Sequence, residues 1–304
     1  MKKTITTIIL ALVFINVNAQ APDWAWAKSI SGPSADAIYG ITTDTLGNVY
    51  IIGDFGSTIN LGTTTLTSAG NQDIFMVKYD PAGNVIWAKS AGGTGIDYGR
   101  GITCDKFGNI YVTGSYRLPS CTFGSTILTN TNTVGRSLFL VKYNDMGDVL
   151  WARNTENYDE YDNSLGLTTD ASGNVYISGN YAPTFISFGT DTLTNTTGSF
   201  NMFLTKYNTM GDVLWAKKSN NMGSEQGNAI DTDTSGNVIL IGTSMAPSMS
   251  FGTSTFNNMG YRDVFIVKYD SLGNVLWADC GGSIYWDYGG GIVTICVNQI
   301  FIDS

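Results

Sequence analysis

Apolar and polar residues alternate with a period of two along most of this chain, in short runs. In one stretch the runs read YGITTD, NVYIIGDF, DIFMVKYD and NVIWAKS, each rich in β-branched and aromatic residues and bounded by Gly, Asn or Asp. Such runs are typical of β-strands separated by tight turns. The pattern therefore predicts a meander of four antiparallel strands, and no long helical period competes with it.

This four-strand unit recurs about every 63 residues. One series of equivalent tryptophans marks the repeat: Trp26, Trp87, Trp151, Trp215 and Trp277. A fixed period of this length is typical of solenoids and propellers. We expect complete repeats at about 36–90, 97–154, 162–218 and 225–280, a partial repeat at 287–304, and a separate fourth strand at 24–28.

The third strand of each unit is apolar on both faces. In the first unit Phe75, Val77 and Tyr79 lie on one side, with Ile74 and Met76 on the other. Since a sheet that meets water on one face alternates apolar with polar residues, these sheets should be covered on both faces by neighbouring repeats. The predicted fold class is all-β, a β-propeller of four-stranded antiparallel blades, with four complete blades and an incomplete fifth.

The unit resembles a known family. Its motifs W-A-K, D-x-x-x-G-I-T-x-D-x-x-G-N-V-Y and F-x-V-K-Y-D-x-x-G-N-V-x-W are similar to the SBBP repeat of secreted bacterial β-propeller proteins, and the similarity extends from Trp24 to Ser304. The resemblance implies a propeller fold and export from a bacterial cell. It implies no particular activity.

Ring closure has two interpretations. The strand at 24–28 could join the two strands of 287–304 in a defective fifth blade, or the chain could be a truncated part of a longer propeller. The second interpretation is favoured because residues 295–299, ICVNQ, have lost the turn glycine of the other units. An open ring would expose apolar faces and promote self-association.

The first 19 residues have the features of a secretory signal. Lys2 and Lys3 precede a short apolar run, and Val17-Asn18-Ala19 supplies a small-residue cleavage site, so we expect cleavage after Ala19. The apolar run is too short to span a bilayer. We therefore predict one secreted propeller domain, residues 20–304, that is extracellular or at the cell surface and has no membrane span.

Composition excludes several classes of function. Removing residues 1–19 takes away two of the 16 basic residues and none of the 25 acidic ones, so the net charge falls from −9 to −11. Such a surface disfavours nucleic acid as a partner. The chain has no histidine, which removes Ser-His-Asp and Cys-His catalysis and histidine-bound zinc. No metal or cofactor is predicted.

The D-x-x-G-N motifs are predicted to be structural turns. Aspartate can bond the turn backbone and glycine can take the left-handed conformation. A calcium loop would need more converging oxygen ligands than one Asp and one Asn supply. These turn residues are Asp44, Gly47, Asp80, Gly83, Asp105, Gly108, Asp170, Gly173, Asp233 and Gly236.

The opposite face receives the long connections between second and third strands. Because strands alternate in direction, these connections and the links between repeats lie across the molecule from the D-x-x-G-N turns, which define the turn face. Each long connection holds a motif such as Phe123-Gly124, Phe188-Gly189 or Phe251-Gly252, predicted to form a small hairpin whose aromatic residue packs inward. Long loops in compact folds are commonly functional, so we expect the contact surface on this long-connection face.

A series of carboxylates begins the first strand of each repeat on that face: Asp36, Asp97, Asp162, Glu225 and Asp287. The series could ring a channel mouth and bind a cation or amine, or serve acid catalysis. Alternatively each carboxylate caps backbone amides where repeats join, which its recurrence in every repeat favours. Candidate ligand-binding aromatic residues beside the series are Tyr98, Tyr158, Tyr161 and Trp286.

Four cysteines invite disulfide bonds, yet Cys104 and Cys121 should lie at opposite ends of their blade, as should Cys280 and Cys296. No disulfide within a blade is predicted. The leading functional hypothesis is a non-catalytic binding or scaffold module with a carbohydrate or protein partner. The alternatives are a carboxylate-dependent glycosidase or lyase at the channel mouth, and a truncated fragment without independent function.

Overall fold

The computed structural model describes residues 25–117, 119–129, 135–156, 163–182, 184–196, 198–219, 223–283 and 287. Those residues form 24 β-strands and no helix. The strands pair in antiparallel sheets. The all-β prediction is therefore confirmed for the part of the chain that the structure describes.

Each repeat forms a four-stranded antiparallel meander, in which the first, second, third and fourth strands of the repeat lie side by side in that order. The two short strands between the second and third strands do not interrupt this order. The first contains β1 (Asp36–Thr43), β2 (Val49–Phe55), β5 (Asp73–Tyr79) and β6 (Val85–Gly92). The second contains β7 (Tyr98–Cys104), β8 (Ile110–Arg117), β11 (Arg136–Tyr143) and β12 (Val149–Asn154). The third contains β13 (Asn163–Thr169), β14 (Val175–Tyr181), β17 (Asn201–Tyr207) and β18 (Val213–Lys218). The fourth contains β19 (Glu225–Thr232), β20 (Val238–Ser244), β23 (Asp263–Tyr269) and β24 (Val275–Gly281).

Every long connection forms the small hairpin that the F-G motifs predict. The hairpins are β3 (Thr58–Leu61) with β4 (Thr64–Thr67), β9 (Ser120–Phe123) with β10 (Thr126–Thr129), β15 (Phe185–Phe188) with β16 (Asp191–Thr194), and β21 (Ser248–Phe251) with β22 (Ser254–Asn257). The motif aromatic is buried, and the ring centroids of Phe123 and Phe139 lie 4.9 Å apart. The predicted packing role is confirmed, and β9 also pairs with β6.

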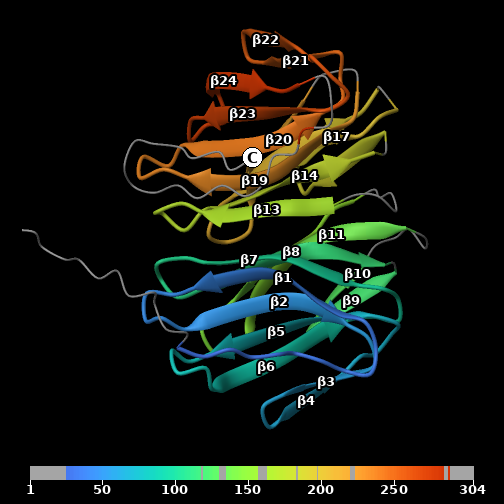
Figure 1. The fold of residues 1–304 in the computed structure, drawn as a ribbon, viewed down its shortest axis with the longest axis vertical. Helices are drawn as coiled ribbons and strands as arrows, with labels where there is room; N and C mark the ends of the chain where they lie inside the picture. Colours follow the sequence, from blue (N-terminus) through green and yellow to red (C-terminus); the bar gives the residue numbers. More distant parts are fainter. Residues whose placement is uncertain are drawn as a thin grey trace, which may run out of the picture.

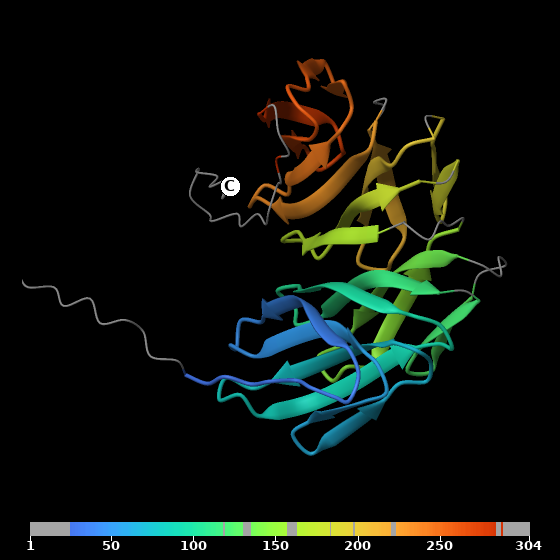
Figure 2. The same cartoon turned by 45° about the vertical axis from the view of Figure 1, so that its right-hand side comes forward.

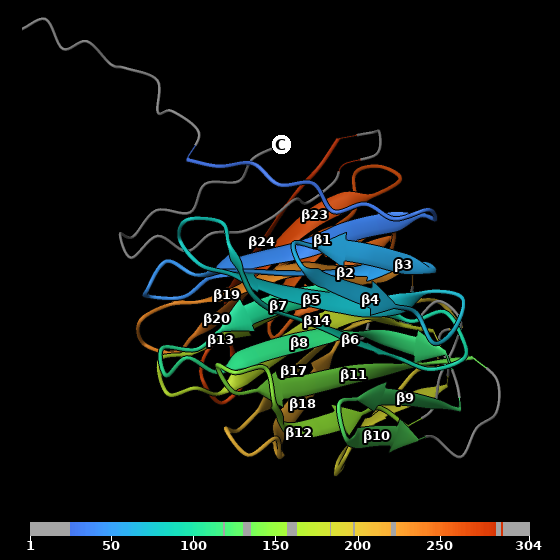
Figure 3. The same cartoon turned by 90° about the horizontal axis from the view of Figure 1, so that it is seen from below.

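The four sheets follow one another in an arc (Figures 1 and 2). β1 packs against β7, β7 against β13, and β13 against β19, so the first strands lie together on the inside of the arc. Seen from below, hairpins β3–β4 and β9–β10 lie at the periphery (Figure 3). The described residues form no closed sheet, and the first and fourth repeats are the two ends of the arc.

Apolar side chains fill the space between successive sheets. Every residue of β5, β11 and β17 is buried, as the continuous apolar sequence of the third strands predicts. One cluster joins Ile74 and Met76 of the first repeat to Phe139 and Val141 of the second. Neighbouring repeats therefore cover one another, which makes each interface between sheets part of the core.

Residues 25–28 form no strand, contrary to the expected fourth strand at 24–28. No strand among the described residues pairs with this segment. Trp26 nevertheless takes the place of a fourth-strand tryptophan, because its indole N–H donates to the Pro81 carbonyl at 3.1 Å as that of Trp87 donates to the Asp145 carbonyl at 3.0 Å. The expected strands of the partial repeat at 287–304 lie outside the described residues, except for Asp287.

The D-x-x-G-N segments have the geometry of the expected turns. Asp105 accepts hydrogen bonds from the amides of Phe107 and Asn109 through Oδ1, both at 2.9 Å. The glycine takes a left-handed φ in each case, which disfavours any side chain: Gly47 at 81°, Gly83 at 82°, Gly108 at 84°, Gly173 at 81° and Gly236 at 77°. The turn face is thus built from local, self-satisfied hydrogen bonds.

Candidate functional site

The carboxylates that begin the repeats hold backbone amides at the junctions between sheets. Asp36, Asp97 and Asp287 each accept a hydrogen bond from an amide four residues earlier, at 2.6, 2.6 and 2.7 Å. Asp97 also accepts from the Arg117 amide at 2.9 Å through its other oxygen. Glu225 is fully buried and accepts from the Ser244 hydroxyl at 3.3 Å. The contacts of the three aspartates are those of the amide-capping alternative.

Four of the candidate binding residues cannot be placed. Asp162, Tyr158, Tyr161 and Trp286 lie outside the described residues, so their roles stay predictions. Tyr98, in contrast, lies in a polar cluster at the junction of the first two repeats.

This inner cluster consists of Tyr39, Asp54, Gln72, Asp97, Tyr98, Arg100 and Arg136. Its members come from β1, β2, β7 and β11 and from the residues just before β5 and β7. Asp54, Gln72 and Arg136 lie where a long connection leaves or rejoins its sheet, and Asp97 and Tyr98 lie where β7 begins on the same face. The cluster therefore belongs to the long-connection face and to the inside of the arc.

Two guanidinium groups stack on tyrosine rings in the inner cluster. The Arg100 guanidinium carbon lies 3.8 Å from the ring centroid of Tyr39 and 4.3 Å from that of Tyr98. The Arg136 guanidinium lies 4.4 Å from the Tyr98 centroid, and its Nη1 donates to the Ile96 carbonyl at 3.0 Å. Stacking of this kind orders both partners. Tyr39 is 47% exposed and the Arg100 side chain 20%, so these two reach solvent.

A fully buried carboxylate lies beneath this stack. Oδ1 of Asp54 is 3.9 Å from Nη1 of Arg100 and has no hydrogen-bond partner, while Oδ2 accepts a hydrogen bond from the Gln72 amide. Burial raises the pKa of Asp54 to about 6, although Arg100 and Arg136 act to lower it. Burial likewise raises the pKa of Asp97 to about 6, against its two backbone hydrogen bonds.

The repeat pattern identified Asp97 and Tyr98 of this cluster but missed Arg100 and Asp54, because these two residues do not recur. The positions equivalent to Arg100 hold Tyr39, Leu165 and Asn228, and those equivalent to Asp54 hold Ser115, Asn180 and Thr243. A search for recurring polar residues therefore misses both. The signal that could have found them is a departure from the repeat, namely a charged residue at a position where the other repeats have an uncharged one.

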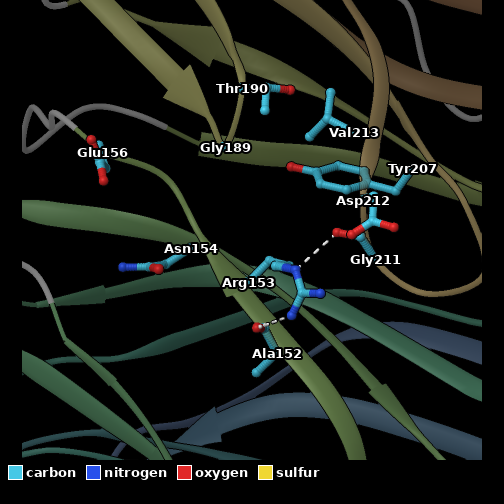
Figure 4. Close-up of a pocket in the computed structure, with 10 residues that line it drawn as sticks. All are labelled: Ala152, Arg153, Asn154, Glu156, Gly189, Thr190, Tyr207, Gly211, Asp212 and Val213. Atoms are coloured by element: carbon cyan, nitrogen blue, oxygen red, sulfur yellow. Dashed lines mark hydrogen bonds between the residues drawn. The ribbon is translucent and has the colours of Figure 1, made fainter.

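Three equivalent grooves form a second candidate site on the outside of the arc. The third of these outer grooves has a volume of about 500 Å³, and Figure 4 shows its lining. It lies between the end of β12, the tip of hairpin β15–β16, Tyr207 and the turn at Gly211-Asp212. The first surrounds Tyr79 with about 340 Å³, and the second surrounds Tyr143 with about 180 Å³.

The hairpins reach these grooves by crossing the outer edge of the sheets. A Cβ added at the tip glycine would lie 3.5 Å from Val85 at Gly62 and 3.8 Å from Val213 at Gly189, so each tip rests on the start of a fourth strand. The fourth strand starts at the turn face. The long connections therefore do not stay on the long-connection face, because burial of their aromatic residues against the third strand draws them across the sheet.

Other features of the described residues are quickly stated. Cys104, Cys121 and Cys280 are free, and Cys296 lies outside the described residues. No group of three metal-ligating side chains occurs within the described ranges. No helix long and apolar enough to cross a membrane is found there either.

Curated relatives match part of the chain. An uncharacterized WD repeat-containing protein of Acanthamoeba polyphaga mimivirus is 28% identical over 235 residues, and regulatory protein FlaEY of Caulobacter vibrioides is 25% identical over 203 residues. Each match covers 65% of this chain but only 17% and 21% of the respective relative. A crystal structure of a Bacteroides caccae protein of unknown function is similar at 9% identity with a TM-score of 0.39, over 81% of this chain and 82% of that one.

The family comparison bears on the repeat itself. The model of the SBBP β-propeller repeat matches residues 25–54 and 86–115. Both segments run from a fourth-strand tryptophan position through the first two strands of the next sheet. The resemblance stated from the motifs is confirmed, and this chain carries the SBBP β-propeller repeat at two places.

Proposed function

We propose that this chain is a repeat-based, non-catalytic binding module that contacts a protein partner through the inner cluster. The SBBP repeats support the module, since stacked repeats present extended concave surfaces for binding. The relatives are a WD repeat-containing protein and a regulatory protein, which favours a protein partner. Because the chain spans a minor part of each relative, their activities are not transferred to it.

One observation carries the proposal: the stack of Tyr39, Arg100 and Tyr98 reaches the surface where the repeats differ from one another. Tyrosine and arginine supply a large share of binding energy at protein interfaces. The stack is held rigid by Arg136 on the far side of Tyr98. A surface that is ordered before binding loses less entropy on association.

The carboxylate-enzyme alternative has less support. Asp54 and Asp97 have the raised pKa values that acid catalysis uses, but both are fully buried. Both oxygens of Asp97 accept backbone hydrogen bonds. A general acid must come within hydrogen-bond reach of its substrate. Neither carboxylate meets that condition, so a role beneath a binding surface accounts for them better.

We also infer that the module acts outside the cell, on the strength of the signal-like residues 1–19. The mass of the N-terminal peptide from protein isolated from its producing cells tests this inference. A mature chain that begins at Gln20 supports export. A chain that retains Met1 and residues 2–19 contradicts it.

Site-directed photo-cross-linking in the producing cells tests the protein partner. A photoreactive phenylalanine analogue replaces Tyr39, and in a control chain it replaces Leu46, which is 78% exposed on the turn face. We expect a discrete protein adduct from position 39, none of the same mass from position 46, and loss of the adduct when Arg100→Ala is added. The same adducts from both positions, or no adduct from position 39, would reject the inner cluster as the contact.

A further inference from the structure

The outer grooves share a feature that the fold does not require. Each is lined by the tyrosine that ends a third strand, and these residues, Tyr79, Tyr143 and Tyr207, are 3%, 3% and 4% exposed. Within the described residues, the Tyr143 hydroxyl is completely buried and has no hydrogen-bond partner. The hydroxyls of Tyr79 and Tyr207 make no hydrogen bond to the described residues, but they do not belong to the fully buried, unpaired groups. In Figure 4 the Tyr207 hydroxyl is directed to the side of the groove where Gly189 and Thr190 lie.

Buried hydroxyls are nearly always paired, because losing a hydrogen bond to water without replacement destabilises the fold. The buried tyrosines of the second strands, Tyr50, Tyr111 and Tyr176, obey the rule, and the Tyr176 hydroxyl contacts Asp170 and the Gly236 carbonyl. The Tyr143 hydroxyl breaks this rule, and the equivalent hydroxyls of Tyr79 and Tyr207 line grooves of the same kind, so a partner from outside the protein would complete all three positions. A ligand hydroxyl can supply it, since tyrosine both donates and accepts.

The other groups in the outer grooves indicate the class of ligand. Each groove adds a hydroxyl at the hairpin tip, supplied by Thr63, Ser125 or Thr190, and an amide or carboxylate from the turn, supplied by Asn84, Asp148 or Asp212. Each groove also has one basic side chain, Lys28, Lys89 or Arg153. The lining thus combines hydrogen-bond donors and acceptors with apolar surface of similar extent.

The basic groups in two of these grooves are already engaged. Lys89 Nζ lies 3.9 Å from the Asp148 carboxylate in the second groove. In the third, Arg153 donates to the carbonyls of Ala152, Met210 and Gly211 at 2.9 to 3.0 Å. A net charge of −9 for the whole chain further disfavours a polyanion. A neutral ligand rich in hydroxyl groups fits these grooves best.

We propose that the outer grooves bind successive sugar units of a neutral polysaccharide. Equivalent grooves in series along one edge match a ligand that is itself repetitive, and simultaneous occupation multiplies weak individual affinities. The site shares no residue with the inner cluster. The two proposals can therefore fail independently.

Binding to an array of neutral glycans, followed by titration of the best oligosaccharide, tests the proposal. The test variant carries Tyr79→Phe, Tyr143→Phe and Tyr207→Phe, which removes the three hydroxyls and keeps the rings. We expect at least a tenfold loss of affinity for the longest oligosaccharide and a smaller loss for each single substitution. The Arg100→Ala variant should bind the glycan normally.

Tyr176→Phe is the matched control, because its hydroxyl is already bonded within the protein. It should lower the melting temperature and leave glycan binding unchanged. Tyr143→Phe should weaken glycan binding and leave the melting temperature unchanged, since its hydroxyl has no internal partner to lose. The proposal is overturned if no neutral glycan binds, if only peptides bind, or if Tyr143→Phe lowers the melting temperature without weakening glycan binding, which would indicate an internal water as the partner.

Discussion

At the scale of single residues, the least expected group is the carboxyl of Asp54. Its neighbours Arg100 and Arg136 favour the charged form, but burial outweighs them and raises the pKa to about 6 from the usual 3.8. An acid with a raised folded-state pKa stabilises the fold fully below about pH 3.8, and this contribution is lost as the pH rises through about 6. Ionised Asp54 therefore weakens the protein at neutral pH.

Asp54→Asn should remove that weakness. Asparagine already occupies the equivalent place in the third repeat, at Asn180, and it can still accept the hydrogen bond from Gln72. We expect the variant to gain about 1 to 2 kcal/mol of unfolding free energy at pH 7.5, since each pKa unit corresponds to about 1.4 kcal/mol. The gain should vanish near pH 4.

Denaturant unfolding at intervals between pH 4 and pH 8 measures this effect. Asp279→Asn, at an exposed carboxylate, serves as the control and should follow the wild-type profile. If Asp54→Asn is destabilising at every pH, then the Asp54 charge supports the fold and the account of the inner cluster is wrong.

Turn residues could be predicted from sequence, whereas of the inner cluster only Asp97 and Tyr98 could. Asp105 and Gly108 act on their own turn, so their roles follow from spacing alone. Asp54, Arg100 and Arg136 come from three strands of two repeats, and nothing local relates them. Their proximity depends on how one sheet packs on the next.

At the scale of elements, the joint between repeats combines a turn glycine with the tryptophan of the preceding fourth strand. A Cβ added at Gly211 would lie 2.9 Å from the Trp151 ring, whose N–H donates to the Thr209 carbonyl at 3.0 Å. Gly108 has nearly the same φ but no atom within 4 Å of such a Cβ. Comparing an alanine substitution at each glycine therefore distinguishes the cost of backbone strain from the cost of lost packing between repeats.

Gly108→Ala should cost about 1 to 2 kcal/mol of unfolding free energy, the typical cost of a left-handed non-glycine residue. Gly211→Ala should cost clearly more, because the added methyl also displaces Trp151. Chemical unfolding gives both values, and the total tryptophan fluorescence of the folded protein should change only in the second variant, because, of the two glycines, only Gly211 contacts a tryptophan ring. Equal costs would show that the tryptophan contact contributes nothing to the joint.

The sequence also predicted the small hairpins but misplaced their tips. The alternation around Phe188 shows which side chain packs inward, and Phe188 does pack on Phe203 at a centroid distance of 5.0 Å. Alternation cannot show how the hairpin as a whole folds over the edge. The tip at Gly189 reaches Val213, which creates the outer groove on a side that the sequence had set aside.

At the scale of the whole molecule, each sheet is covered by the next, and one tryptophan ends the series. Trp26, Trp87, Trp151 and Trp215 each donate to a carbonyl of the following repeat. Trp277 is 38% exposed, and its N–H has no acceptor among the described residues. Exposed aromatic surface at the end of a stacked array promotes association with another copy.

Sedimentation velocity over a range of concentrations tests this expectation. We expect the wild-type protein to associate as its concentration rises, and Trp277→Ser to shift the equilibrium toward monomer by at least tenfold. Met146→Ser, at an apolar residue that is exposed on the turn face, should leave association unchanged. A wild-type protein that stays monomeric at every concentration would contradict the expected self-association.

The central claim is that the repeats build a scaffold and that protein binding lies where they differ, at the inner cluster. Calorimetric titration of the purified partner identified by cross-linking tests it most directly, with wild-type protein, Arg100→Ala and Tyr143→Phe compared. The account predicts at least a tenfold weaker affinity for Arg100→Ala, about 1.4 kcal/mol, and wild-type affinity for Tyr143→Phe. Wild-type affinity for Arg100→Ala would contradict the claim.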